Sequence, residues 1–198
     1  MEYSFHVHNK LAADGVTMAL NSLLQTHKNT HSEDKTSTLE HYGGEPPIVV
    51  CIGSDLAIGD SLGPVTGSLL KHKTQGLNAY VYGTLSAPVT AKEIKYVRTF
   101  LKETHKNSPV IAIDAAVGAQ GDIGLLRISD TPLLPGAGAK KQLGALGDLS
   151  IMGIVAEKSI GNYGLLNTTR LNLVYSMAEI LAEALSTLLF SLREKRCG

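Results

Sequence analysis

The sequence has no tryptophan, only three phenylalanines and only two cysteines among its 198 residues. Two cysteines cannot form a disulfide framework, and Cys51 lies inside an apolar run, so we expect a buried thiol in a reducing compartment. Basic and acidic residues number 18 each, and this zero net charge argues against nucleic-acid binding through a basic face. The amino terminus lacks the apolar core of a signal peptide, and no run approaches the ~18 apolar residues that span a bilayer. The sequence therefore predicts a cytoplasmic protein with neither a membrane nor a nucleic-acid partner.

The amino-terminal quarter differs in composition from the rest. Residues 10–25 place Val16, Leu20, Leu23 and Leu24 on one helical face, whereas residues 26–47 are almost entirely polar. We therefore expect a helix and a polar linker over residues 1–47 and a folded domain over residues 48–198.

From residue 48 onward, short apolar runs alternate with helical patterns. The expected strands are 48–52, 79–82, 110–113, 123–128 and 151–156, and the expected helices are 62–73, 90–105 and 169–194. This alternation predicts an α/β fold, a three-layer α/β/α sandwich around a mostly parallel sheet. The last helix has a wide apolar face, which we assign to the core, with a homo-oligomer interface as the alternative.

Three aspartates follow strands in this scheme, where ligands bind in such sheets. Asp55 and Asp60 lie in the loop after the first strand, and Asp114 closes the third. If those strands are adjacent, Asp60 and Asp114 could meet, and one of two close carboxyls must then keep its proton. The ionised partner could activate water. The alternative for Asp60 is a helix cap, because a predicted helix begins near Leu62.

The motifs of serine hydrolases, nucleotide-binding loops and zinc sites are either incomplete or absent in this sequence. The segment GDSLG, residues 59–63, fits the G-x-S-x-G pattern of serine hydrolases, but no histidine follows His105 to act as a base, and eight residues separate Ser61 from the end of the strand at Ile52. The loop GSDLAIG, residues 53–59, lacks the lysine of a P-loop and the spacing of a dinucleotide site. There is no C-x-x-C or H-E-x-x-H motif. We therefore expect no cofactor and no zinc.

Four segments together resemble a known family. In order they read CIGSDLAIGDSLGP, VYGTLSAPVTAK, IAIDAAVG and LPGAGAKKQLGALGDLSIMGIV, within residues 48–192. They resemble the YyaC-like sporulation proteins, regarded as spore proteases and similar to the germination protease of spore-forming bacteria. The resemblance implies the phosphorylase/hydrolase-like sandwich shared with hydrogenase maturation endopeptidases, and it implies Asp60 and Asp114 as the catalytic pair. It also implies a protein or peptide substrate, small acid-soluble spore proteins among them, in the forming spore or sporulating cell.

The maturation endopeptidases raise the question of a metal. They bind nickel through a glutamate, an aspartate and a histidine, whose positions the resemblance puts at Asp60, Asp114 and Lys141. Because lysine is a poor nickel ligand, we expect no metal. We expect Lys141 to contact the substrate instead, together with Asp55 and Asp148. Two alternatives to the aspartate-dependent peptidase stay open: a non-catalytic peptide-binding or regulatory protein on the same fold, and a metal-assisted maturation endopeptidase.

Overall fold

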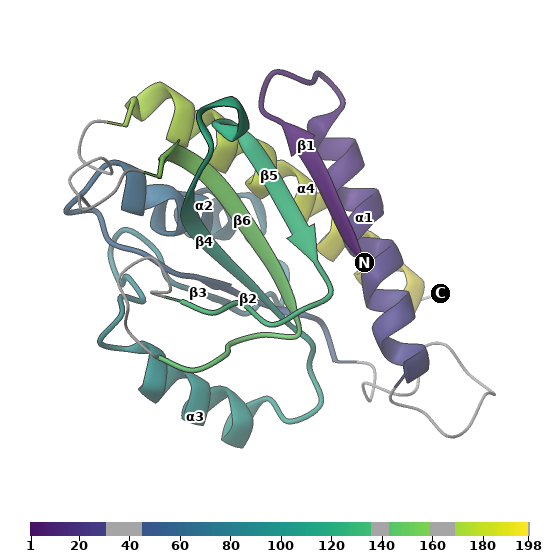
Figure 1. Cartoon of the computed structure of the whole chain (residues 1–198). Helices are drawn as coiled ribbons and strands as arrows, with labels where there is room; N and C mark the ends of the chain where they lie inside the picture. Colours follow the sequence, from purple (N-terminus) through teal and green to yellow (C-terminus); the bar gives the residue numbers. More distant parts are fainter. Residues whose placement is uncertain (31–44, 136–142, 159–168, 198) are drawn as a thin grey trace.

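The computed structural model describes residues 1–30, 45–135, 143–158 and 169–197 (Figure 1). Its helices and strands are β1 (Glu2–His6), α1 (Ala12–Thr30), β2 (Ile48–Cys51), η1 (Gly59–Ser61), α2 (Leu62–Lys73), β3 (Val81–Tyr82), α3 (Ile94–Thr104), β4 (Val110–Gly118), η2 (Gln120–Asp122), β5 (Leu125–Ser129), β6 (Leu149–Glu157) and α4 (Leu171–Cys197). The six strands form one sheet in the order β1-β5-β6-β4-β2-β3. β3, β2, β4 and β6 are parallel, and β5 and β1 add antiparallel at one side.

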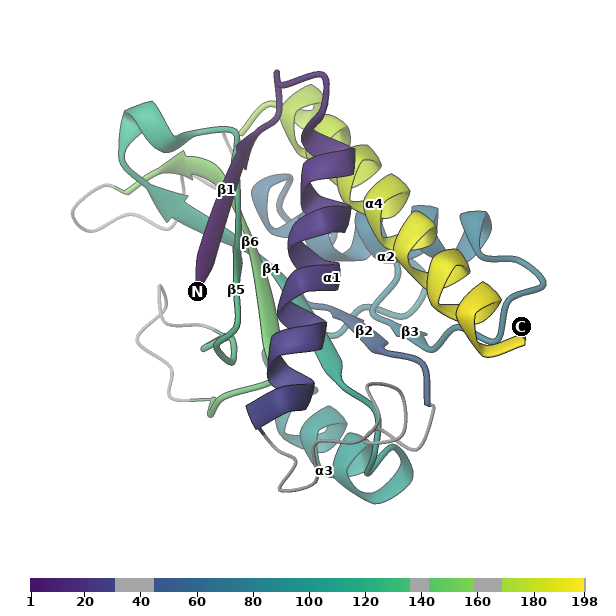
Figure 2. The same cartoon turned by 90° about the vertical axis from the view of Figure 1, so that its right-hand side faces the viewer.

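The sheet lies between two layers of helices, as the alternation of strands and helices predicted. Along β2 the side chains of Val49 and Cys51 join the core under α1, α2 and α4, whereas Ile48 and Val50 join the core under α3. Every residue of this strand is fully buried, which is why its sequence is a continuous apolar run rather than an alternating one. Figures 1 and 2 show α1, α2 and α4 together on one face, with α3 on the other. The predicted α/β/α sandwich is confirmed.

The expected separation of residues 1–47 from the main domain is wrong for the part that the structure describes. β1 pairs antiparallel with β5, from Glu2 opposite Ser129 to His6 opposite Leu125, and so forms an edge strand of the same sheet. α1 packs along α4 and contributes to the main core (Figure 2). Much of the predicted polar linker lies outside the described residues.

The long final helix packs in the core as its apolar stripe predicted. Val174, Met177, Leu181 and Leu185 are fully buried. Within the described part of the chain, one stretch, Leu171–Glu194, is long and apolar enough to cross a membrane by length and composition alone. Its apolar residues cover the sheet together with α1 and α2, so we interpret the stretch as the central helix of the core.

Candidate active site

The loop that follows β2 folds back on itself and brings Asp60 to the end of the strand. The Ser54 N–H donates to the backbone oxygen of Asp60 at 3.1 Å, and the Asp60 N–H donates to Ala57 O at 3.0 Å. Gly53 has a φ of 139°, and a Cβ there would lie 2.1 Å from the Asp60 oxygen. Glycine is therefore required for the loop to close at this point.

A second glycine holds the start of α2 against the same strand end. A Cβ on Gly63 would lie 2.0 Å from Ile52 O, so the first turn of the helix rests directly on the backbone of the strand. η1, which carries Asp60, packs against β4 and α4 as a result. The sequence GDSLG is thus a close-packed junction between a strand and a helix.

The geometry of this junction argues against two other interpretations of the loop, Asp60 as a helix cap and Ser61 as a nucleophile. The residue before α2 is Ser61, not Asp60, and no side chain caps this helix or η1. Ser61 is buried, and its hydroxyl donates to Ile58 O at 2.6 Å. Asp60 is therefore not the helix cap, and Ser61 has a structural hydrogen bond rather than the exposure of a nucleophile.

Asp114 lies in the middle of β4 and not at its end, which corrects the predicted boundary. The strand continues to Gly118 because its small and apolar residues pair with β6 along their whole length. Relative to β2, however, Asp114 lies one residue beyond the last pair, Cys51 opposite Ile113. The side chain is therefore at the rim of the β2–β4 part of the sheet, where the carboxyl-end rule expects a ligand.

The carboxyl groups of Asp60 and Asp114 interact electrostatically in this structure. Burial raises the pKa of Asp114, and the neighbouring Asp60 carboxylate raises it further, to about 8. Burial also raises the pKa of Asp60, and the backbone N–H of Ser54 opposes part of this shift. The Ala115 N–H donates to Asp114 Oδ1 at 2.9 Å, which lowers the Asp114 pKa only in part. The fold therefore favours the protonated form of the Asp114 carboxyl near neutral pH.

The backbone N–H groups of Ser54 and Ala115 are parts of this site that sequence reasoning missed. Each acts on one of the two carboxyls. Gly53 was the available signal, because a glycine directly after a buried strand indicates a close backbone approach.

The remaining predicted site residues are not brought together with this pair. Asp55 is exposed on the loop. Asp148 lies at the opposite end of β4, where its carboxylate accepts the Val110 N–H at 2.8 Å and its own N–H donates to Val110 O at 2.8 Å. This exchange is a structural link between the starts of β4 and β6. Lys141 lies outside the described residues.

No metal-binding cluster is formed by the residues that the structure covers. They include no group of three histidine, cysteine, aspartate or glutamate side chains placed to hold an ion. Asp60 and Asp114 supply two carboxylates, and the third position implied by the family resemblance, Lys141, is not among the described residues. Cys51 is a free, buried thiol, as predicted, and burial raises its pKa, which makes it a poor ligand in the folded state.

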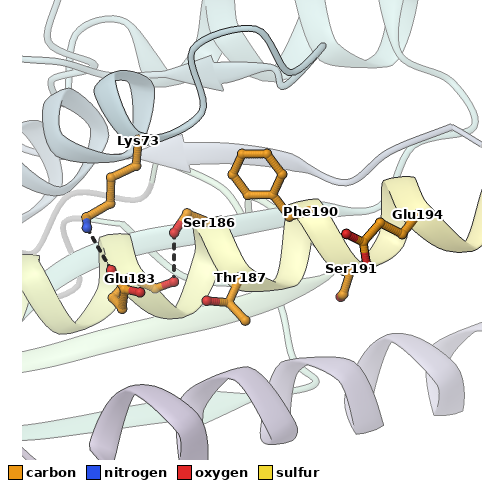
Figure 3. Close-up of a pocket in the computed structure, with 7 residues that line it drawn as sticks. All are labelled: Lys73, Glu183, Ser186, Thr187, Phe190, Ser191 and Glu194. Carbon is orange, nitrogen blue, oxygen red and sulfur yellow. Dashed lines mark hydrogen bonds and ion pairs between the residues drawn. The ribbon is translucent and has the colours of Figure 1, made fainter.

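A surface groove of about 480 Å³ lies away from the carboxyl pair, between the end of α2 and the outer side of α4 (Figure 3). It is spanned by an exposed ion pair in which Lys73 Nζ lies 2.7 Å from Glu183 Oε2, beside the partly exposed ring of Phe190. Exposed ion pairs contribute little stability. The groove contains none of the predicted site residues.

Fold and site together define an α/β protein with a carboxyl pair at the rim of a mostly parallel sheet. The chain belongs to the family described as proteins of unknown function, DUF1256, whose profile matches residues 21–184. A relative from Bacillus subtilis (strain 168), the uncharacterized protein YyaC, is 48% identical over 151 residues, which are 76% of this chain and 73% of the relative. The resemblance to YyaC-like proteins is thereby confirmed.

Among solved structures, the chain is similar to the NiFe hydrogenase maturation protease HycI from Thermococcus kodakarensis KOD1. The TM-score is 0.47 and the identity 21%, and the match covers 76% of this chain and 97% of that one. Neither the family description nor the relative's name states an activity, so the function is argued from the site.

Proposed function

We propose that this protein is an endopeptidase in which Asp60 and Asp114 activate water for hydrolysis of a peptide bond. The observation that carries the proposal is the electrostatic coupling of the two carboxyls, which come from separate segments of the chain, together with the pKa of Asp114, which burial and the Asp60 carboxylate raise to about 8. Raising the pKa of one acid of a pair keeps it protonated at the pH where its partner is ionised, which is the requirement for acid and base catalysis at one site.

The proposed reaction follows from this distribution of the proton. The Asp60 carboxylate takes a proton from a water molecule while the water oxygen attacks the scissile carbonyl carbon. The Asp114 carboxylic acid donates its proton to the carbonyl oxygen as charge develops there. The tetrahedral intermediate collapses when the proton on Asp60 passes to the leaving nitrogen, and the carbonyl re-forms as its proton returns to Asp114. Both aspartates are thereby restored to their starting states.

The proposed substrate is a protein or peptide, with small acid-soluble spore proteins as the first class to examine. This part of the proposal is supported by the resemblance of residues 48–192 to sporulation proteins rather than by the site geometry. The same resemblance supports a role inside the forming spore or the sporulating cell.

A second candidate function is peptide docking without hydrolysis. One observation favours it: a separate backbone N–H lies beside each aspartate, since Asp114 accepts the Ala115 N–H and the Ser54 N–H lowers the pKa of Asp60. Carboxyls held in this way could recognise a basic peptide without exchanging protons. The two candidates differ in whether a bond is broken.

Incubation of the purified protein with small acid-soluble spore proteins, followed by mass spectrometry, separates these candidates. We expect cleavage by the wild type and a loss of about 10²-fold or more in rate for Asp60→Asn and for Asp114→Asn, because each removes a proton-transfer group. Glu103→Gln, on the exposed side of α3, is the matched control and keeps the wild-type rate. Binding with no cleavage supports docking. Tight nickel or zinc binding by calorimetry that disappears in Asp60→Ala supports the metal-assisted alternative.

A further inference from the structure

The part of β4 that carries Asp114 runs past the end of its neighbour on one side. The pairing of β2 with β4 ends at Cys51 opposite Ile113, and the last hydrogen bond is from the Ile52 N–H to Ile113 O, at 2.7 Å. β4 continues to Gly118 and pairs there only with β6 among the described strands. Figure 1 shows β4 and β6 running on together beyond β2.

The backbone groups of β4 point alternately to its two sides, as in any strand. Gly118 O accepts the Lys158 N–H at 2.7 Å on the β6 side, whereas Ile113 O faces β2. Odd-numbered residues of β4 therefore point their backbone N–H and C=O groups toward the side on which β2 lies, including the part of β4 that extends beyond the end of β2. The one register shift in this ladder adds a residue, Val155, to β6, so the alternation along β4 is preserved.

Two residues, Ala115 and Val117, present their backbone groups on this side. The Ala115 N–H is already bonded to Asp114 Oδ1. The Ala115 C=O and the N–H and C=O of Val117 have no hydrogen-bond partner among the residues that the structure describes. Both residues are half-buried. Because backbone polar groups removed from water require partners, a chain that pairs here gains hydrogen bonds that the described part of the protein does not supply.

We infer that this edge of β4 is the place where the polypeptide substrate binds, as an added strand beside residues 115–117. The inference rests on the proposed function, since the same edge carries Asp114 and lies against the η1 segment that carries Asp60. A chain in this position runs along the strand that carries Asp114, and η1, which carries Asp60, contacts that strand. The loop before η1 exposes two apolar side chains, Leu56, which is 92% exposed, and Ile58. The substrate is therefore an extended segment that is recognised mainly through its backbone.

Binding is tested with the Asp60→Asn protein, in which turnover is prevented. The two probes are a degenerate, fluorescein-labelled library of ten-residue peptides and the same library N-methylated at alternate positions. Val117→Pro removes the N–H of Val117, for which the described residues supply no acceptor, without touching the β6 ladder, and proline is tolerated at strand edges. Val117→Ala is the matched control, because it keeps the N–H and shortens the side chain. We expect fluorescence anisotropy to show about tenfold weaker binding for Val117→Pro than for Val117→Ala. The N-methylated library, which needs no change in the protein, should bind about tenfold more weakly than the parent library.

Equal binding of the library by Val117→Pro and Val117→Ala, with both folded by circular dichroism, overturns the inference. So does equal binding of the parent and N-methylated libraries, or no binding of the parent library. The hydrolase proposal is judged separately, by mass spectrometry of the parent library after incubation with the wild type. Backbone-dependent binding without cleavage supports this edge as the binding place and contradicts the hydrolase proposal.

Discussion

The replacement Asp114→Asn should stabilise the protein at neutral pH while removing its activity. In the folded state Asp114 titrates at about 8, far above its ordinary value of 3.8. The native state therefore holds a proton that the unfolded chain releases between these two values. The contribution of this group to folding is fully present below pH 4 and is lost as the pH rises through 8. Asparagine has the shape of the protonated acid, can still accept the Ala115 N–H, and does not titrate.

The size of the effect follows from the shift. Each unit of pKa shift corresponds to ~1.4 kcal/mol. Between pH 4 and pH 7 the wild type passes through about three units of this shift, so its free energy of unfolding is lower at pH 7 than at pH 4 by at most roughly 4 kcal/mol. This is a large part of the stability of a typical domain. We expect the free energy of unfolding of Asp114→Asn to exceed that of the wild type by up to this amount at pH 7, and the two proteins to be similar at pH 4.

Urea denaturation at a series of pH values measures this difference directly, provided that the m-values agree. Glu103→Gln serves as the control for removing a carboxylate, because this side chain is exposed on α3 and its replacement should leave the wild-type pH dependence intact. If the Asp114→Asn and wild-type curves run parallel from pH 4 to pH 8, the carboxyl is not held in its protonated form by the fold and the reasoning is refuted.

Two further predictions concern the rate and the packing of the site. The pH profile of kcat/KM should be bell-shaped, rising as Asp60 ionises above its ordinary 3.8 and falling near pH 8 as Asp114 loses its proton; a profile that stays flat to pH 9 contradicts the assignment of the acid. Gly63→Ala should lower the free energy of unfolding by about 2 kcal/mol or more in urea denaturation, because the added Cβ would lie 2.0 Å from Ile52 O. Gly121→Ala, with open space around it, should change that free energy by less than about 0.5 kcal/mol, and an equal effect of the two changes would contradict the close packing.

Local patterns predicted the layers of the fold, because they report burial directly. The run at 48–52 indicated a strand covered on both faces, and the last helix showed its buried stripe. β1 was missed because it is short, half exposed, and pairs with β5 more than a hundred residues away. Such non-local pairing leaves no local signature in the sequence.

The site was predictable in part. The proximity of Asp60 and Asp114 followed from assuming adjacent strands, and the structure supplies that adjacency, with β3 outside β2 rather than between the two. The end of the strand at Asp114 was misplaced because the following residues are small and apolar and continue the pairing with β6. Asp148 illustrates a different error: it precedes a parallel strand, so it belongs at the opposite rim from residues that follow one.

The central claim is that two carboxyls from separate segments share a single proton, and carboxyl-carbon NMR titration of the aspartates tests it most directly. In the wild type we expect Asp114 to titrate near 8. In Asp60→Asn its pKa should fall, because the neighbouring negative charge is gone, yet stay above 3.8 because the burial remains. A wild-type Asp114 that titrates near 4, or one whose pKa does not change in Asp60→Asn, would contradict the claim.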